Sequence, residues 1–219
     1  KMFERILVPL EGSELAELAL PYVEELAATL NSAVELIYCS KPAEASYRHM
    51  HQLYVEKMAQ QVRDNIEANY TGKVNLTASV GAVILDGDPA ACIIDYAESN
   101  DIDLIVMVSH GHFGRMPWSI GSVTVKVIHR ISKPILLIRT GTSSRQIGTG
   151  EMFNKILMPL DGSGNGEAAL PYVRELASKI KTEITLLQVV ATGQYLHRTG
   201  GGLNYVLFPE QEVGMMQTK

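Results

Sequence analysis

Long apolar runs, clusters of positive charge and paired cysteines are all scarce in this sequence of 219 residues. No apolar run approaches the roughly 18 residues that a transmembrane helix needs, so we expect no membrane span. The net charge of -5, without a dense Lys/Arg cluster, argues against a nucleic-acid-binding surface, which must neutralise a track of phosphates. With 46% hydrophobic and 20% charged residues, the composition is typical of a soluble globular protein.

Only two cysteines are present, Cys39 and Cys92, and they do not form a Cys-x-x-Cys pair. Each lies in an apolar stretch, which favours buried free thiols over a disulfide or a metal site. No signal-peptide pattern is recognisable at the start of the sequence. We therefore expect a cytoplasmic protein without a metal centre.

The sequence contains an internal repeat with a shift of 150 residues. Residues 2–40 align without a gap to residues 152–190, and eighteen of the 39 aligned pairs are identical. The identical pairs include Pro9/Pro159, Gly12/Gly162 and Ser13/Ser163. This similarity predicts a complete domain over 1–140, a linker rich in Gly, Ser and Thr over 141–151, and an incomplete second copy over 152–219.

Within the first copy, apolar runs alternate with segments that have helical periodicity. The runs predict strands over 5–10, 34–39, 74–84, 103–108 and 134–139. Between them we expect a helix from Ser13 to about residue 30 that is kinked at Pro21, and further helices over 47–70, 87–97 and 121–131. Strict alternation of this kind predicts an α/β fold in which a doubly wound parallel sheet is covered by helices on both faces.

Two loops have the composition expected of a ligand site in such a sheet, where ligands bind beyond the carboxyl ends of the strands. Glu11-Gly12-Ser13 follows the first strand, and Ser109-His110-Gly111 follows the fourth. A helix then begins at Gly121-Ser122, and a helix N-terminus offers free N–H groups to an anion. A carboxylate after the first strand can accept hydrogen bonds from ribose hydroxyls. The pattern predicts a nucleotide that extends from the first strand to the loop after the fourth.

The segments ILVPLEGS, GDPA, DLIVMVSHG, GSVTVKVIHR and KPILLIR, in this order, resemble the universal stress protein family. The resemblance covers residues 2–140 fully and 152 to about 190 in part. It implies a flavodoxin-like (Rossmann-like) five-stranded sheet with strand order 3-2-1-4-5. It also implies a homodimer, for which we expect the edge strand 134–139 to be the contact.

One branch of that family binds ATP through Gly-x2-Gly-x9-Gly-Ser/Thr. Three of the four positions are present here, as Gly111, Gly121 and Ser122, whereas Val108 stands in place of the first glycine. The family's aspartate after the first strand is Glu11 here and Asp161 in the second copy. By resemblance, ATP, with or without Mg²⁺, is implied to contact Pro9, Leu10, Glu11, Cys39, Met107, Val108, Ser109, His110, Gly111, Gly121, Ser122, Val123 and Thr124.

The sequence leaves three functions open. The first is a universal stress protein that binds an adenine nucleotide and regulates a stress response with little or no turnover, because no Walker-type Gly-x4-Gly-Lys-Ser/Thr sequence is present. The second is a nucleotide-free member acting as a dimeric scaffold, which Val108 favours. The third is an adenylating enzyme, which would need a pyrophosphate loop that Glu11-Gly12-Ser13-Glu14 does not supply. No nucleophile with a sequence rationale stands beside His110, so we assign no catalytic residue.

Overall fold

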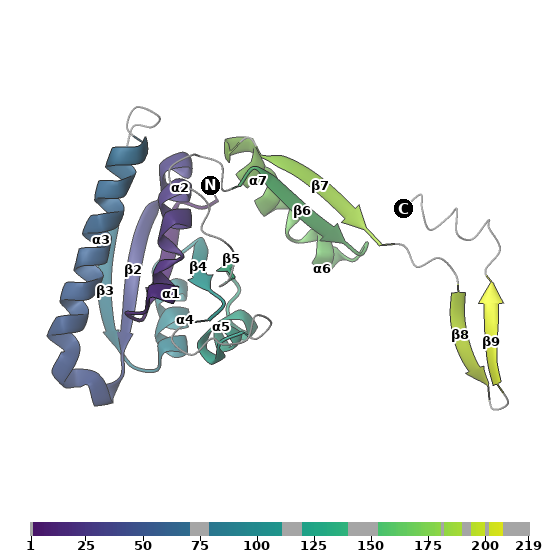
Figure 1. The fold of residues 1–219 in the computed structure, drawn as a ribbon, viewed down its shortest axis with the longest axis horizontal. Coiled ribbons are helices and arrows are strands. Elements are labelled where there is room, and N and C mark those ends of the chain that lie inside the picture. Colours follow the sequence, from purple (N-terminus) through teal and green to yellow (C-terminus); the bar gives the residue numbers. More distant parts are fainter. Residues whose placement is uncertain are drawn as a thin grey trace. The chain divides into compact units, whose positions relative to one another are not determined.

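The computed structural model describes residues 2–70, 79–110, 120–139, 153–180 and 182–189, and the backbone of 194–199 and 202–207 (Figure 1). The chain divides into two compact units, Lys1–Met152 and Phe153–Lys219. Each unit is considered by itself below.

The first unit is built on a parallel sheet of five strands. The strand order is β3-β2-β1-β4-β5, which confirms the order implied by the resemblance. The apolar runs form these strands because residues buried on both faces of a parallel sheet need no polar alternation. β5 lies at an edge of the sheet, as the expected dimer contact requires, and the dimer itself stays a prediction. The strands are β1 (Arg5–Leu10), β2 (Ala33–Ser40), β3 (Val80–Asp86), β4 (Leu104–Val108) and β5 (Ile135–Ile138).

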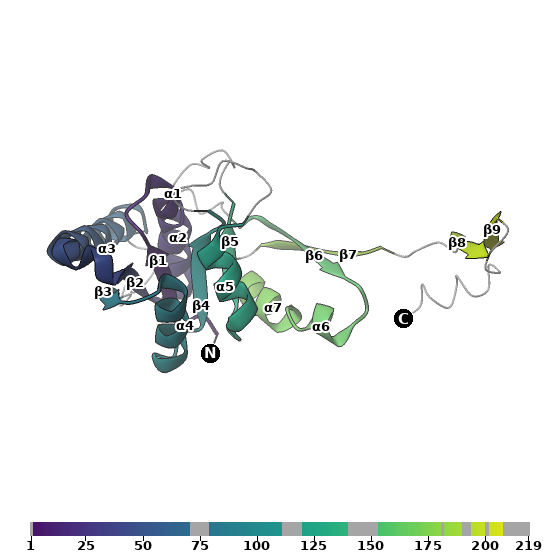
Figure 2. The ribbon, with the colours of Figure 1, turned by 90° about the horizontal axis from the view of Figure 1, so that it is seen from below.

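Helices cover both faces of this sheet, as Figure 2 shows. One face carries α1 (Glu14–Glu17), α2 (Leu20–Leu30) and α3 (Arg48–Tyr70), and the other carries α4 (Pro89–Ser99) and α5 (Ser122–Arg130). A 3-10 helix, Pro42–Tyr47, forms where a loop was expected before α3.

The first crossover contains two helices, where the sequence predicted one kinked helix. Ser13 caps α1 by accepting a hydrogen bond from the backbone N–H of Ala16 at 3.1 Å, and α1 ends at Glu17. Pro21 then stands in the first turn of α2. Proline fits that turn because its missing N–H would have no partner inside the helix there. The kink prediction was therefore wrong, and Pro21 starts a helix instead of bending one.

The core between the sheet and the α4–α5 layer holds buried side chains of β1, β2 and β4, and partly buried side chains of β3 and β5 pack against it. Leu7, Ile37, Ile105 and Met107 from the strands pack with Ile93 and other buried side chains of that layer. Leu7 is completely buried. This packing anchors the carboxyl ends of β1, β2 and β4, where the candidate site lies.

The opposite face of the sheet buries a carboxyl group. Glu24 of α2 is 1% exposed, and its Oε1 accepts a hydrogen bond from Asn65 Nδ2 of α3 at 2.8 Å. Its Oε2 has no hydrogen-bond partner among the described residues. Burial raises the pKa of Glu24 above its usual value, and the Asn65 hydrogen bond offsets part of this effect.

Glu24 should make the protein less stable as the pH rises. Because its pKa is higher in the folded state than in the unfolded state, folding takes up a proton between the two values. The free energy of unfolding then falls as the pH rises from about 4.5 through the folded pKa. We expect Glu24→Gln, which keeps the Asn65 hydrogen bond, to raise Tm at pH 7 by roughly 2–4 °C.

This expectation is checked by thermal unfolding of both proteins between pH 4 and pH 8. The difference in Tm should vanish at the acid end, where Glu24 is protonated in both states. Glu67→Gln, on the exposed side of α3, is the matched control and should leave Tm almost unchanged throughout. A Tm difference that does not depend on pH would contradict an ionisation effect.

The second unit opens with the same order of elements as the first. β6 (Lys155–Leu160) and β7 (Glu183–Gln188) form a two-stranded parallel sheet, and α6 (Gly164–Glu167) and α7 (Leu170–Ile180) connect them. A separate antiparallel hairpin follows, formed by β8 (Gln194–Thr199) and β9 (Gly202–Leu207). The sequence analysis did not predict this hairpin, although a Gly-Gly pair such as Gly200-Gly201 is typical of two-residue hairpin turns.

Candidate functional site

The candidate site lies at the carboxyl ends of β1 and β4. These strands are neighbours in the sheet, with Ile6 opposite Leu104 and Leu7 opposite Ile105. β1 leads to helices on one face, and the chain after β4 returns through α5 on the other. The topology thus places the loop after β1 next to the loop after β4, at the point where the crossovers diverge.

The loop after β1 is held by a hydrogen bond between side chains. Ser13 is buried, and its Oγ donates to Glu11 Oε1 at 3.0 Å while it caps α1. Gly12 between them has φ +80°, a conformation that costs other residues free energy. The carboxylate of Glu11 is therefore fixed at the end of β1.

In the second unit, the loop after β6 is the equivalent of the loop after β1, and Asp161 makes two hydrogen bonds to it. Its Oδ1 accepts hydrogen bonds from both Ser163 N, at 2.9 Å, and Ser163 Oγ, at 2.7 Å. These bonds lower the pKa of Asp161, chiefly through the Ser163 side chain. An aspartate is short enough to accept from the backbone N–H two residues ahead. In the first unit the Ser13 hydroxyl makes the corresponding bond to Glu11.

The start of α5 is tied to the end of β4 by two hydrogen bonds. Thr124 Oγ1 donates to the carbonyl oxygen of Val108 at 3.2 Å, and the N–H of Gly121 donates to the carbonyl oxygen of Ser109 at 2.7 Å. Thr124, Val108 and Ser109 are all buried. The N-terminus of α5 is therefore fixed against the strand end.

Gly121 is the N-cap of α5, and a glycine has no side chain with which to cap the helix. A Cβ at Gly121 would lie 3.3 Å from the carbonyl oxygen of Ser109 and 3.7 Å from His110 Cα. This close approach explains why glycine is needed here, although its φ of -62° is one that any residue adopts. The first turn of α5 thus keeps N–H groups that no cap side chain from Gly121 satisfies.

The other expected site residues fall around these two loops. Pro9 and Leu10 end β1, Cys39 lies next to the end of β2, and Met107 packs into the core beneath. His110 is 6% exposed, with its Nδ1 3.3 Å from Ser109 Oγ. Ser122 and Val123 begin α5, and Gly111 lies outside the described residues. Val108 has extended backbone geometry and is the last residue of β4.

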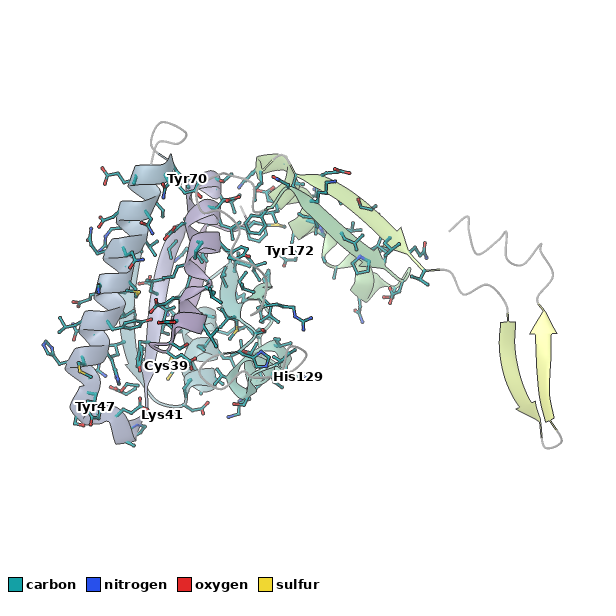
Figure 3. The ribbon with its side chains drawn as sticks, in the orientation of Figure 1. Cys39, Lys41, Tyr47, Tyr70, His129 and Tyr172 are labelled. Carbon is teal, nitrogen blue, oxygen red and sulfur yellow. The ribbon has the colours of Figure 1, made fainter. Side chains whose placement is uncertain are left out.

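The thiols of Cys39 and Cys92 lie within hydrogen-bond contact of each other. Burial is the main cause that raises the pKa of Cys39, and the neighbouring Cys92 raises it further. A thiol with a raised pKa is a poor nucleophile. Cys39, which Figure 3 shows at the lower end of β2, is therefore suited to lining an apolar wall.

Two residues at the same edge of the sheet were missed as site candidates. Asp88 caps α4 through the backbone N–H of Ala91 at 3.1 Å, and this bond is the main cause that lowers its pKa. Lys126 Nζ of α5 lies 3.7 Å from Asp88 Oδ2. The GDPA segment had been interpreted only as the start of a helix. Nothing in the sequence indicated that Asp88 pairs with a residue 38 positions later.

Among the described residues, no group of three or more His, Cys, Asp or Glu side chains is arranged to hold a metal ion. None of the described helices is both long enough and apolar enough to cross a membrane. The described part of the candidate site presents backbone N–H groups and the Ser122 hydroxyl as hydrogen-bond donors, and the Glu11 carboxylate as an acceptor.

The strand order and the helices on both faces of the parallel sheet define a flavodoxin-like α/β fold. The chain belongs to the universal stress protein family, whose family model matches residues 2–139. This match confirms the family assignment made from the sequence motifs.

Individual relatives support this family assignment. Universal stress protein MJ0577 of Methanocaldococcus jannaschii is 26% identical over 159 residues, which is 65% of this chain and 98% of that protein. Its solved structure superimposes with a TM-score of 0.50 at 27% identity over 65% of this chain and all of the other. A universal stress protein of Methanothermobacter thermautotrophicus is 29% identical over 64% of this chain and 98% of its own length.

A solved universal stress protein of Archaeoglobus fulgidus gives a TM-score of 0.62 at 19% identity. The similarity covers 87% of this chain and 69% of that one. At this identity it supports the fold alone.

Proposed function

We propose that the first unit is a regulatory domain that binds an adenine nucleotide, ATP in the first instance, with little or no turnover. The observation that carries the proposal is the attachment of the α5 N-terminus to the end of β4. The hydrogen bonds Thr124–Val108 and Gly121–Ser109 hold the first turn of α5, with its uncapped N–H groups, at the carboxyl end of β4. Such N–H groups and the helix dipole favour phosphate.

The remaining contacts of the nucleotide follow from the surrounding residues. Glu11, held by Ser13, accepts from the ribose hydroxyls, and Pro9, Leu10 and Cys39 form an apolar wall for the adenine. The Ser122 hydroxyl stands at the phosphate end, whereas the buried Thr124 hydroxyl holds the start of α5 by donating to the Val108 carbonyl. Because the described residues form no acidic metal cluster, Mg²⁺ would arrive with the phosphates of the nucleotide.

A second candidate function is a nucleotide-free scaffold, and Val108 is the residue that favours it. Its branched side chain and extended backbone stand where the ATP-binding branch of the family has glycine. The proposed binding mode, however, uses only the backbone carbonyl of Val108. This carbonyl accepts a hydrogen bond from the Thr124 hydroxyl, which holds the start of α5 in place. The close approach of α5 to the Ser109 carbonyl favours a small residue at the start of α5, and Gly121 supplies it.

The nucleotide content of the purified protein tests the proposal. The protein is heat-denatured, and the supernatant is compared with ATP, ADP and AMP by anion-exchange chromatography. We expect a stoichiometric adenine nucleotide, or else a clear rise in Tm on addition of millimolar Mg-ATP. An empty supernatant together with an unchanged Tm would favour the scaffold.

A further inference from the structure

The two cysteines of the sequence lie far apart along the chain and meet in the first unit. Cys39 is the last residue but one of β2. Cys92 lies in the first turn of α4, where its N–H donates to the carbonyl oxygen of Asp88 at 2.9 Å. The two thiols are within hydrogen-bond contact of each other. Both side chains are partly exposed, which leaves the pair open to a small solute.

Gly87 makes room for this contact. Its N–H donates to the carbonyl oxygen of Ser40 at 2.9 Å, which places it beside the end of β2. A Cβ at Gly87 would lie 2.9 Å from Cys92 Sγ, too close for two non-bonded atoms, and its φ of +148° is one that other residues rarely adopt. The Cys92 sulfur therefore occupies space that a side chain at this position would fill, next to Cys39.

The two thiols differ in how readily they ionise. Burial is the main cause that raises the pKa of Cys39, and the neighbouring Cys92 raises it further. Burial also raises the pKa of Cys92, but the hydrogen bond from Cys39 offsets part of this effect, while the carboxylates of Asp95, Asp88 and Asp86 add to it. Cys92 is therefore the thiol that ionises first and reacts with an oxidant, more slowly than a free thiol does.

We propose that Cys39 and Cys92 form a reversible oxidation site, at which a peroxide converts the two thiols to a disulfide between β2 and α4. The Cys92 thiolate attacks the peroxide, the O–O bond breaks, and Cys92 becomes a sulfenic acid. The Cys39 sulfur then attacks the Cys92 sulfur, and the hydroxyl group leaves with the Cys39 proton as water. Overall, two thiols and one hydrogen peroxide give one disulfide and two waters. A dithiol reverses the change by thiol–disulfide exchange.

The disulfide would tighten the junction of β2 and α4. A sulfur–sulfur bond is about 2.05 Å long, which is shorter than the contact of two thiols, so the end of β2 and the start of α4 must approach each other. Under the proposed function Cys39 lines the adenine wall, and we expect oxidation to weaken ATP binding about fivefold or more. This consequence rests on the proposed function, whereas the disulfide itself does not.

Intact mass spectrometry of the whole chain, treated with hydrogen peroxide under non-denaturing conditions, tests the disulfide. We expect a monomer that has lost two hydrogen atoms and both free thiols, and that regains them with dithiothreitol. Because the sequence holds no other cysteine, this product is the Cys39–Cys92 disulfide. A disulfide-linked dimer, or a monomer that keeps both thiols, would overturn the proposal.

Single substitutions test which thiol reacts first. In Cys39→Ser no second thiol attacks the Cys92 sulfenic acid, so dimedone should trap it. Cys92→Ser leaves only the thiol with the more strongly raised pKa, and we expect at least about tenfold less dimedone adduct there. Equal trapping in the two variants would overturn the assignment of Cys92 as the attacking thiol. Far-UV circular dichroism confirms that each variant is folded.

Titration calorimetry with Mg-ATP, on reduced and oxidised protein, tests the effect on the nucleotide site. We expect weaker binding to the oxidised chain and recovery with dithiothreitol. Peroxide-treated Cys92→Ser is the control, because its methionines meet the same oxidant but no disulfide forms, and it should keep its affinity. A loss in this control, or equal affinity of the two states of the parent, would overturn the effect on the adenine wall. If neither state bound ATP, the proposed function would be contradicted, and the mass measurement would still decide the disulfide.

Discussion

Leu7→Ala should lower the free energy of unfolding of the first unit by about 3 kcal/mol, whereas Leu157→Ala should change stability by less than about 0.5 kcal/mol. The two leucines occupy the same position of the repeat. Leu7 is completely buried in the α4–α5 core, whereas Leu157 is 60% exposed. Truncation of Leu7 removes apolar burial and leaves a cavity, whereas truncation of Leu157 only shortens a side chain that water already reaches.

Urea unfolding of the full-length chain, followed by far-UV circular dichroism, measures both effects. Most of the described helical residues belong to the first unit, so the main transition reports on it. Equal shifts of the midpoint in the two variants would mean that Leu157 is covered in solution. A negligible effect of Leu7→Ala would contradict the core described above.

Gly121→Ala should weaken ATP binding about tenfold, and Gly121→Val by about a hundredfold or more, under the proposed function. A Cβ at this position lies 3.3 Å from the Ser109 carbonyl oxygen, which accepts the Gly121 N–H. The end of β4 and the start of α5 must therefore move apart. Because φ is -62°, the substitution causes no backbone strain, and the effect comes from this displacement alone.

Gly164→Ala is the matched control. Gly164 also stands at a helix start, and a Cβ there meets nothing within 4 Å. Isothermal titration calorimetry with Mg-ATP should give the parent affinity for Gly164→Ala. If Gly121→Ala also kept the parent affinity, the start of α5 would not be the phosphate site, even where the parent protein binds ATP.

The sequence predicted the sheet because each strand of the first unit is a continuous apolar run between helical segments. Local signals also led to the two loops of the candidate site, since glycines and hydroxyl residues stand beside the strand ends, and their role in binding stays a prediction. The sequence did not predict the contacts within the candidate site. The bond from Thr124 to Val108 spans 16 residues, and the ion pair of Asp88 with Lys126 spans 38. Such pairs form only when the strand order brings two crossovers together.

The errors have local causes. Pro21 was interpreted as a kink because helical periodicity runs across it, yet α1 had already ended at Glu17. The β8–β9 hairpin was not predicted because neither Gln194–Thr199 nor Gly202–Leu207 alternates regularly between apolar and polar residues.

The break between α1 and α2 also bears on how the chain moves. α1 is a single turn of four residues, and the backbone bonds that close it, from Glu17, Leu18 and Ala19, are 3.2–3.3 Å long. One turn cannot sustain itself by helical cooperativity, and Pro21 passes no hydrogen bond backward from α2. This turn should open by local fluctuation far more often than α2, so that its amides exchange with solvent first. Under the proposed function, α1 is then the part of the candidate site beside Glu11 that opens most readily.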